Sequence, residues 1–179
     1  ISYAQIIQQA MLPDLQEIYS VLPDSFVLFK PRDVVSGDFY FFHQNNHSFI
    51  IAAADCTGHG VPGAFMSMIG SEELNISTSE NKNTGEILSL LNKGIKKFLH
   101  QSGEKTFIRD GMDIALCSID LKNKIVKFSG ANRPMWIIRN GTSEIFEIKG
   151  THEAIGGLTP YDQPFETITI PLQKGDSFY

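Results

Sequence analysis

The strongest constraint on the fold is an apolar run that ends in an acidic residue beside glycines. Residues 50–54 are Ile-Ile-Ala-Ala-Ala, and Asp55, Gly58 and Gly60 follow. A short apolar run of this kind is typical of a strand buried on both faces. The carboxylate of Asp55 would then emerge at a strand end, where glycines let a ligand approach the backbone. A helix cap is the alternative role, but helical spacing begins only near Pro62.

Two further aspartates stand at the ends of apolar strands. Asp38 follows Gly37 and precedes Phe-Tyr-Phe-Phe, and Asp113 leads into the apolar strand 114–119. Carboxylates that converge from neighbouring strand ends indicate a site for a hard cation with oxygen ligands. Such a site can activate water for the hydrolysis of a phosphate ester.

Each candidate residue also has a structural interpretation. Asp38 lies in a Ser-Gly-Asp sequence that is common in turns, and Asp113 fits a solvent-facing strand position, with Asp110 as its rival. His59 could be a general acid, a phosphate contact or an ordinary loop residue. Three arginines could clamp a phosphate bidentately, and their spacing selects none of them: Arg32, Arg109 and Arg133.

After a first helical segment, the remaining pattern predicts strands, then two helices, then strands. Helical spacing covers residues 3–11, a segment from about Pro62, and a segment with Thr84 as N-cap and Glu86 in its first turn. This order predicts an α+β fold with two mainly antiparallel sheets and helices packed outside. The expected strands are 26–29, 38–43, 48–54 after a turn at 44–46, 114–119, 125–128, 135–138, 145–148, 165–170 and 176–179.

Length and composition limit the alternatives. The 179 residues are enough for one domain with a core, and the net charge of −5 without a basic stripe argues against nucleic-acid binding. Cys56 and Cys117 cannot build a disulfide framework and favour a reducing compartment. No run approaches the roughly 20 apolar residues of a membrane span. We therefore expect a cytoplasmic domain, whose parent protein could be membrane-anchored.

Two longer strings carry a family resemblance. Residues 30–40, Lys-Pro-Arg-Asp-Val-Val-Ser-Gly-Asp-Phe-Tyr, and residues 55–64, Asp-Cys-Thr-Gly-His-Gly-Val-Pro-Gly-Ala, resemble the first two motifs of the SpoIIE-type serine phosphatases. These are the bacterial branch of the PPM (protein phosphatase 2C) superfamily. Shorter matches follow in the family's order at 111–113, 129–134, 155–157 and 175–176.

The resemblance implies a PPM-type β-sandwich flanked by helices and the dephosphorylation of phosphoserine or phosphothreonine in a protein. It also implies two Mn²⁺ or Mg²⁺ ions, with Asp38 on one, Asp113 on the other and Asp55 bridging both. The backbone carbonyl of Cys56 would assist, and His59, four residues after Asp55, is a candidate acid. Water activated by the two ions would attack phosphorus in line.

The resemblance also suggests a domain organisation. Residues 1–13 resemble the linker helix that precedes this domain in multi-domain sensors, and residues 14–179 resemble the phosphatase domain without its closing Ser/Thr-Asp-Gly motif. We therefore expect a C-terminally incomplete piece of a longer bacterial signalling protein with an N-terminal sensor domain. The implied substrate is a phosphorylated regulator such as an anti-sigma-factor antagonist, and the apolar face of the first helix could pair two copies.

Two alternatives remain open at this point. A non-catalytic binding module could share the PPM fold and regulate by contact alone. A metal-dependent nucleotide enzyme also uses paired aspartates, but it would require a phosphate-cradling loop, and the sequence shows none.

Overall fold

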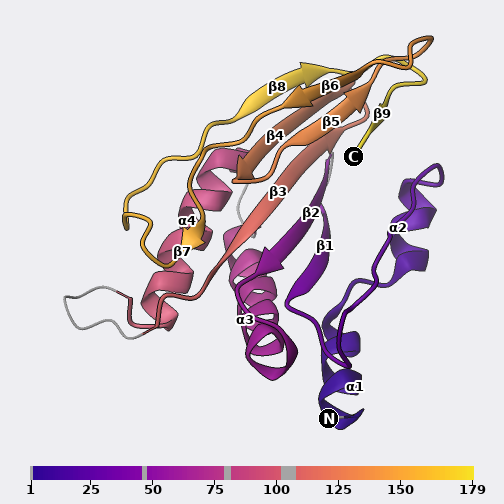
Figure 1. Ribbon diagram of the computed structural model, residues 1–179. Coiled ribbons are helices and arrows are strands. Elements are labelled where there is room, and N and C mark those ends of the chain that lie inside the picture. The colour runs from indigo at the N-terminus through magenta and orange to yellow at the C-terminus, as the bar shows by residue number, and fades with distance from the viewer. Residues whose placement is uncertain (1, 46–47, 79–81, 102–107) are drawn as a thin grey trace.

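The computed structural model is a β-sandwich with helices packed on the outer face of its larger sheet (Figure 1). It describes residues 2–45, 48–78, 82–101 and 108–179. The strands are β1 (Asp38–Gln44), β2 (Phe49–Cys56), β3 (Gly111–Asp120), β4 (Ile125–Ala131), β5 (Met135–Ile138), β6 (Ile145–Ile148), β7 (Ile155–Gly156), β8 (Ile168–Pro171) and β9 (Ser177–Phe178). The helices are α1 (Ser2–Met11), α2 (Leu15–Val21), α3 (Gly60–Thr78) and α4 (Thr84–Phe98).

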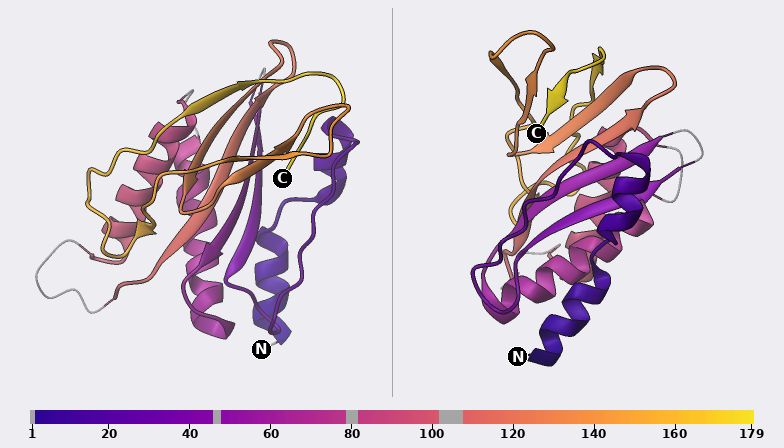
Figure 2. Two further views of the ribbon diagram at one scale, coloured as in Figure 1. Left: turned by 45° about the horizontal axis from the view of Figure 1, so that its top comes forward. Right: turned by 90° about the vertical axis from the view of Figure 1, so that its right-hand side faces the viewer.

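Both sheets are antiparallel throughout their strand pairs. The larger sheet has the order β1-β2-β3-β4-β8, with β7 paired to one end of β3, and the smaller sheet has the order β6-β5-β9. The predicted α+β class and the two-sheet architecture are confirmed. Two views show helices α3 and α4 on one side of the larger sheet and the smaller sheet at one end of its other side (Figure 2).

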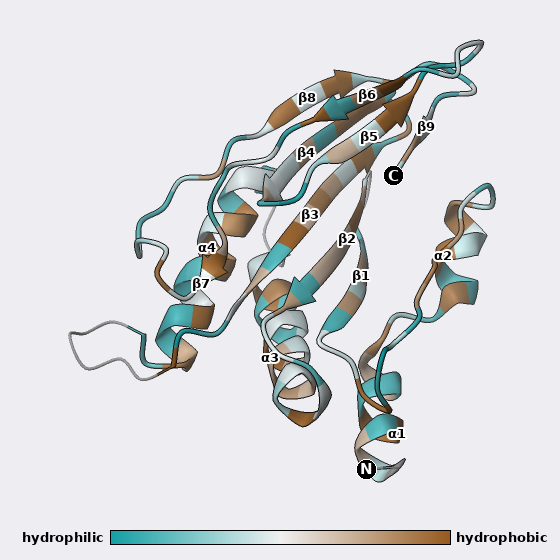
Figure 3. Ribbon diagram, viewed as in Figure 1, coloured by the Kyte–Doolittle hydropathy of each residue, from teal (hydrophilic) through white to brown (hydrophobic). Residues whose placement is uncertain are grey.

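The main core lies between the larger sheet and the helices α3 and α4. Side chains alternate along β2, so that Ile50, Ala52 and Ala54 are buried against the helices. A second core lies between the two sheets, where Phe128 and Ile137 are among the buried side chains. Hydrophobic residues follow the strands, while the tip of the β2 arrow is hydrophilic (Figure 3).

The prediction that β2 is buried on both faces was wrong. Ile51 is partly buried, whereas Ala53 and Asp55 on the same face are exposed. The physical reason is that the smaller sheet packs on the part of β2 that carries Ile51 and leaves the end at Asp55 open. The candidate site requires only that the end of β2 at Asp55 is open.

The N-cap of helix α4 lies one residue earlier than expected. Asn83, not Thr84, is the N-cap: its side chain accepts a hydrogen bond from the Glu86 N–H, and the Glu86 carboxylate accepts one from the Asn83 N–H. Glu86 therefore closes a capping box, which stabilises the helix start. Thr84 is instead buried and accepts a hydrogen bond from Ser129.

Several other elements differ from the predictions. The predicted helix over 3–11 is confirmed, but α2, capped by Asp14, was not predicted. Residues 26–29 are not a strand, because none of the strands in the described residues pairs with them, and the ring of Phe29 packs on Tyr40 instead. The strand β7 is too short for periodicity to reveal, and β8 begins later than the predicted 165–170. The turn predicted at 44–46 extends beyond the described residues.

Within the described parts of the chain, every helix is too short or too polar to cross a membrane.

Candidate metal centre

The three predicted aspartates form a row across adjacent strands. In the antiparallel register Asp38 of β1 lies opposite Asp55 of β2, and Asp55 lies opposite Asp113 of β3. Directly opposite residues point to the same face, with Cβ atoms about 4.5–5.5 Å apart. We call Asp38, Asp55 and Asp113 the carboxylate row. It stands on the open end of the face that the smaller sheet covers elsewhere.

The carboxylate row concentrates negative charge at one end. The pKa of Asp38 is raised by its partial burial, then by the charge of Asp55 and a hydrogen bond with it. Arg133 acts in the opposite direction on this pKa. The metal-free row is therefore electrostatically unfavourable at Asp38, and a nearby cation would relieve it.

Arg133 and its neighbour Asn132 face the other two aspartates. The Arg133 Nη2 atom donates to Asp55 Oδ2, and its Nε atom lies 3.9 Å from Asp113 Oδ2. The Asn132 side-chain amide donates to Asp113 Oδ1 at 3.0 Å. Of the three arginines that the sequence could not rank, Arg133 is therefore the one at the carboxylate row.

The donor set fits a hard cation. Carboxylate oxygens are the ligands that Mg²⁺ and Mn²⁺ favour, and the row presents them from three rigid strands. As they stand, no three acidic, histidine or cysteine side chains in the described residues converge closely enough to hold an ion. Arg133 donates to a carboxylate oxygen of the row, so its guanidinium and a bound ion would compete for that oxygen.

Cys56 directs its side chain away from this face. The thiol is buried on the face opposite Asp55, where burial raises its pKa, so the side chain does not reach the carboxylate row. The backbone N–H of Cys56 donates to the Gly37 carbonyl at 3.3 Å, which joins β2 to the segment before Asp38. Any role of Cys56 in metal binding would use its backbone carbonyl, as the resemblance implies.

His59 is not brought to the carboxylate row. Its Nδ1 atom lies 3.4 Å from Asp33 Oδ2, and its side chain is 71% exposed. None of the contacts among the described residues joins it to Asp38, Asp55 or Asp113. The structure thus favours the interpretation of His59 as a loop residue paired with Asp33.

Three glycines pack the backbone tightly beneath the row. A Cβ atom on Gly37 would lie 2.8 Å from the Gly58 carbonyl oxygen, and one on Gly63 would lie 2.6 Å from the same oxygen. Real Cβ atoms do not approach so closely, so any larger residue would force the segments apart. The segment before β1, the loop after β2 and the first turn of α3 therefore touch without intervening side chains.

Thr57 ties the end of β2 to the start of β3. Its hydroxyl donates to the Gly111 carbonyl at 2.7 Å and accepts from the Gly111 N–H at 2.6 Å. The Thr57 N–H also donates to the Gly111 carbonyl, at 2.9 Å. These bonds hold Asp55 and Asp113 in register, a role that sequence reasoning missed because a Thr in a loop carries no distinguishing signal.

Helix α1 reaches the same region through a buried glutamine. The Gln8 amide donates to the Ser36 carbonyl at 2.6 Å and to Ser67 Oγ of α3 at 2.8 Å, and it accepts from the Ser36 N–H at 2.9 Å. Ser36 in turn accepts the Asp38 N–H through its hydroxyl at 3.0 Å. Gln8 thus connects the first helix to the segment that positions Asp38, a link that no local sequence pattern indicates.

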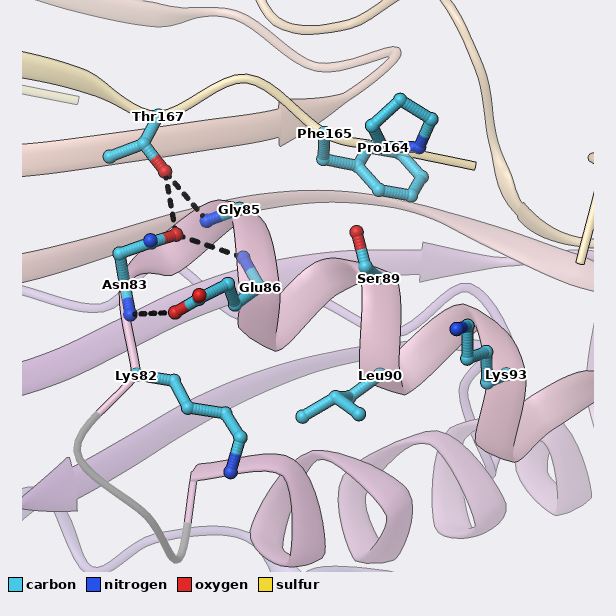
Figure 4. Close-up of a pocket in the computed structure, with 10 residues that line it drawn as sticks. All are labelled: Lys82, Asn83, Gly85, Glu86, Ser89, Leu90, Lys93, Pro164, Phe165 and Thr167. Atoms are coloured by element: carbon cyan, nitrogen blue, oxygen red, sulfur yellow. Dashed lines mark hydrogen bonds between the residues drawn. The ribbon is translucent and has the colours of Figure 1, made fainter. Parts of the chain in front are cut away.

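A separate hollow lies at the start of α4. It is bordered by the α4 capping box and by the segment around Phe165, with Lys93 further along the helix (Figure 4). The Thr167 hydroxyl donates to Asn83 and accepts from the Gly85 N–H, so this N–H at the helix start already has a hydrogen-bond partner. This hollow contains none of the carboxylate row.

Comparisons with known proteins agree with this geometry. The family model described as Stage II sporulation protein E (SpoIIE) matches residues 45–179. The SiaA-PP2C domain of Pseudomonas aeruginosa is similar at 32% identity, with 99% of this chain and 68% of that chain covered and a TM-score of 0.84. No sequence in the collection of curated proteins matches significantly.

Two more distant structures share the fold. The structure of RsbX in complex with magnesium is 20% identical, covers 86% of this chain and 69% of that one, and has a TM-score of 0.63. The PP2C phosphatase domain of SpoIIE from Bacillus subtilis, with a regulatory fragment, is 22% identical, covers 79% and 39%, and has a TM-score of 0.60. The sandwich, the carboxylate row and the family match together show that this chain belongs to the SpoIIE family of PP2C-type serine phosphatase domains.

Proposed function

We propose that this domain is a metal-dependent protein phosphatase that hydrolyses phosphoserine or phosphothreonine on a regulatory protein. The observation that carries the proposal is the carboxylate row, in which Asp55 lies opposite both Asp38 and Asp113. Three carboxylates on one open face are a suitable ligand set for two hard cations. The family to which the chain belongs supports the same reaction class.

The proposed roles follow from position in the row. Asp38 and Asp113 stand at the two ends and would each hold one Mn²⁺ or Mg²⁺ ion, and the central Asp55 would contact both. When bound, the ions would supply an acidified water and neutralise charge on the phosphoryl oxygens. Thr57 and the glycines beneath the row keep the carboxylates in place. We assign His59 no step, because it pairs with Asp33.

We also propose a class of substrate and a cellular setting for the domain. An open sheet end suits a phosphoserine presented on the surface of another protein, such as an anti-sigma-factor antagonist. We propose that the domain acts in the cytoplasm as the output of a longer signalling protein with a sensor before residue 1. The α1 face that carries Tyr3 and Ile6 is exposed and could pair two copies.

One observation favours a second candidate function. Arg133 already neutralises part of the row, and no three suitable ligands among the described residues converge as they stand. A domain that never binds metal would keep this arrangement and act as a non-catalytic binding module.

Manganese-dependent release of phosphate from a phosphoserine protein distinguishes the two functions. The assay would use this chain and, in parallel, the full-length product of its gene, each beside an Asp55→Asn variant. Turnover that requires manganese and is lost in the variant supports the phosphatase. A folded wild-type protein that shows no turnover at any manganese concentration supports the binding module.

A further inference from the structure

We propose that Arg133 is an internal counter-cation of the carboxylate row, which competes with divalent cations for Asp55 and Asp113 and so sets the metal affinity. The inference rests on the proposed metal centre, because it concerns the same carboxylate oxygens. It differs from a phosphate-clamping role, in which Arg133 would contact the substrate and not the aspartates.

The backbone around Arg133 is held in place from both sides. A Cβ atom on Gly130 or on Gly150 would clash with the Arg133 carbonyl oxygen, so these two glycines enclose it. Pro134 follows and restricts Arg133 to an extended backbone. The backbone of Arg133 is therefore fixed in position, so only the side-chain rotamers are ordered when its guanidinium binds the row.

The residue before it completes this anchoring. Asn132 has a φ of 56°, a left-handed conformation that Asn tolerates better than most residues. Its N–H donates to the Thr151 carbonyl at 2.9 Å, and the Thr151 N–H donates to the Gly130 carbonyl at 2.8 Å. This turn directs the Asn132 amide and the Arg133 guanidinium to the same aspartate pair.

The contacts occupy the oxygens that a metal would use. Arg133 binds Asp55 Oδ2 and approaches Asp113 Oδ2, while Asn132 binds Asp113 Oδ1. The guanidinium occupies a lone pair of a carboxylate oxygen that a divalent cation would use and would repel that cation, so the two positive groups compete for the row. Arg133 thereby stabilises the metal-free row and lowers the apparent affinity for metal, by the linkage between competing ligands.

The solvent exposure of these side chains limits how strongly Arg133 weakens metal binding. The side chains of Arg133, Asp55 and Asp113 are 45%, 53% and 34% exposed, so solvent screens the pairs. A screened but anchored pair implies that removal of the guanidinium tightens metal binding by about three- to tenfold.

The test is a Mn²⁺ titration, followed by calorimetry and by the electron paramagnetic resonance signal of free Mn²⁺. Wild-type protein would be compared with Arg133→Met, which keeps the aliphatic length, and Arg133→Gln, which keeps polar contacts without the charge. We expect both variants to bind Mn²⁺ more tightly and to have a lower melting temperature in chelator. Arg133→Lys keeps the charge and should lie between them and wild type.

The outcomes separate this inference from the proposed function. Wild-type binding with unchanged or weaker affinity in the folded Met and Gln variants would overturn the role of Arg133 and leave the metal centre standing. Absence of Mn²⁺ binding in the wild type and in both variants would overturn the metal centre and this inference together. An Asp55→Asn variant, which removes the shared ligand, is the baseline for specific binding.

Discussion

The carboxylates of Asp38 and Asp55 lie directly opposite each other on two adjacent antiparallel strands, and both side chains are exposed. Like charges in this relationship destabilise a strand pair. Partial burial raises the pKa of Asp38, and the repulsion from Asp55 raises it further. Proteins retain such arrangements where function requires them, and the first prediction follows from this.

Replacing Asp38 with Asn should stabilise the metal-free protein. The substitution removes a charge beside Asp55 and keeps the shape, and solvent screening limits the gain to about 1 kcal/mol or less. Urea unfolding at neutral pH in the presence of chelator measures it. With Mn²⁺ in excess the order should reverse, because wild type gains more from the ligand than Asp38→Asn does. A variant less stable than wild type in chelator contradicts the repulsion.

Thr57 provides a prediction with a closely matched control. Thr57→Val removes a hydroxyl that both donates to and accepts from Gly111, and the Gly111 N–H loses its partner. The expected cost is about 1–3 kcal/mol of unfolding free energy. Thr57→Ser keeps the hydroxyl and should lose little. Equal destabilisation of the two variants in denaturant titrations would show that the methyl group, and not the hydrogen bonds, matters at this position.

Gln8 should decide whether α1 stays attached to the domain. Gln8→Ala removes three buried hydrogen bonds to Ser36 and Ser67, worth about 2 kcal/mol or more together. We expect limited proteolysis between α1 and β1 to become faster, with the rest of the domain intact. The neighbouring Gln9 is exposed, so Gln9→Ala is the control. Identical cleavage rates for both variants would exclude Gln8 as the attachment.

Asp176 predicts a pH dependence of stability. Its carboxylate accepts from the Gln173 N–H at 2.9 Å, from the Asn140 N–H at 3.0 Å and from Arg139 at 2.6 Å. These bonds, the Gln173 N–H first, hold the pKa of Asp176 below its ordinary 3.8. A lowered pKa means that the stabilisation is complete above about 3.8 and is lost as the pH falls through the lower, folded value.

The comparison with Asp176→Asn isolates this contribution. Thermal unfolding of both proteins from pH 7 to pH 3 should show wild type more stable at neutral pH, with a difference that narrows only below about pH 4. A difference that stays constant down to pH 3 would mean that the carboxylate charge contributes nothing.

The site was predictable from sequence in part, for physical reasons. Apolar runs that begin after Asp38 and Asp113 or end before Asp55 indicate strand ends, because alternation and turn residues are local signals. The register that places the three opposite one another depends on the pairing of distant strands. The sequence therefore indicated the three candidate ligands, and only the structure showed that they form one row.

Arg133 illustrates what local patterns cannot supply. It was one of three arginines without a distinguishing spacing. Its direction depends on Gly130, Gly150 and Thr151, which meet it only in the folded sandwich. Residues 26–29 show the converse, because their strand-like composition has no partner strand to pair with. A segment with high strand propensity does not form a strand unless a neighbouring strand pairs with it.

The contact of Gly37 with Gly58 and Gly63 has a mechanical consequence. Side chains ordinarily act as compliant spacers, since they can change rotamer when two segments shift. Here peptide backbone touches peptide backbone, so a displacement of the first turn of α3 has no soft element to absorb it. The start of β1, with Asp38 attached, would have to move by nearly the same amount. A movement of α3 would therefore be transmitted directly to the carboxylate row.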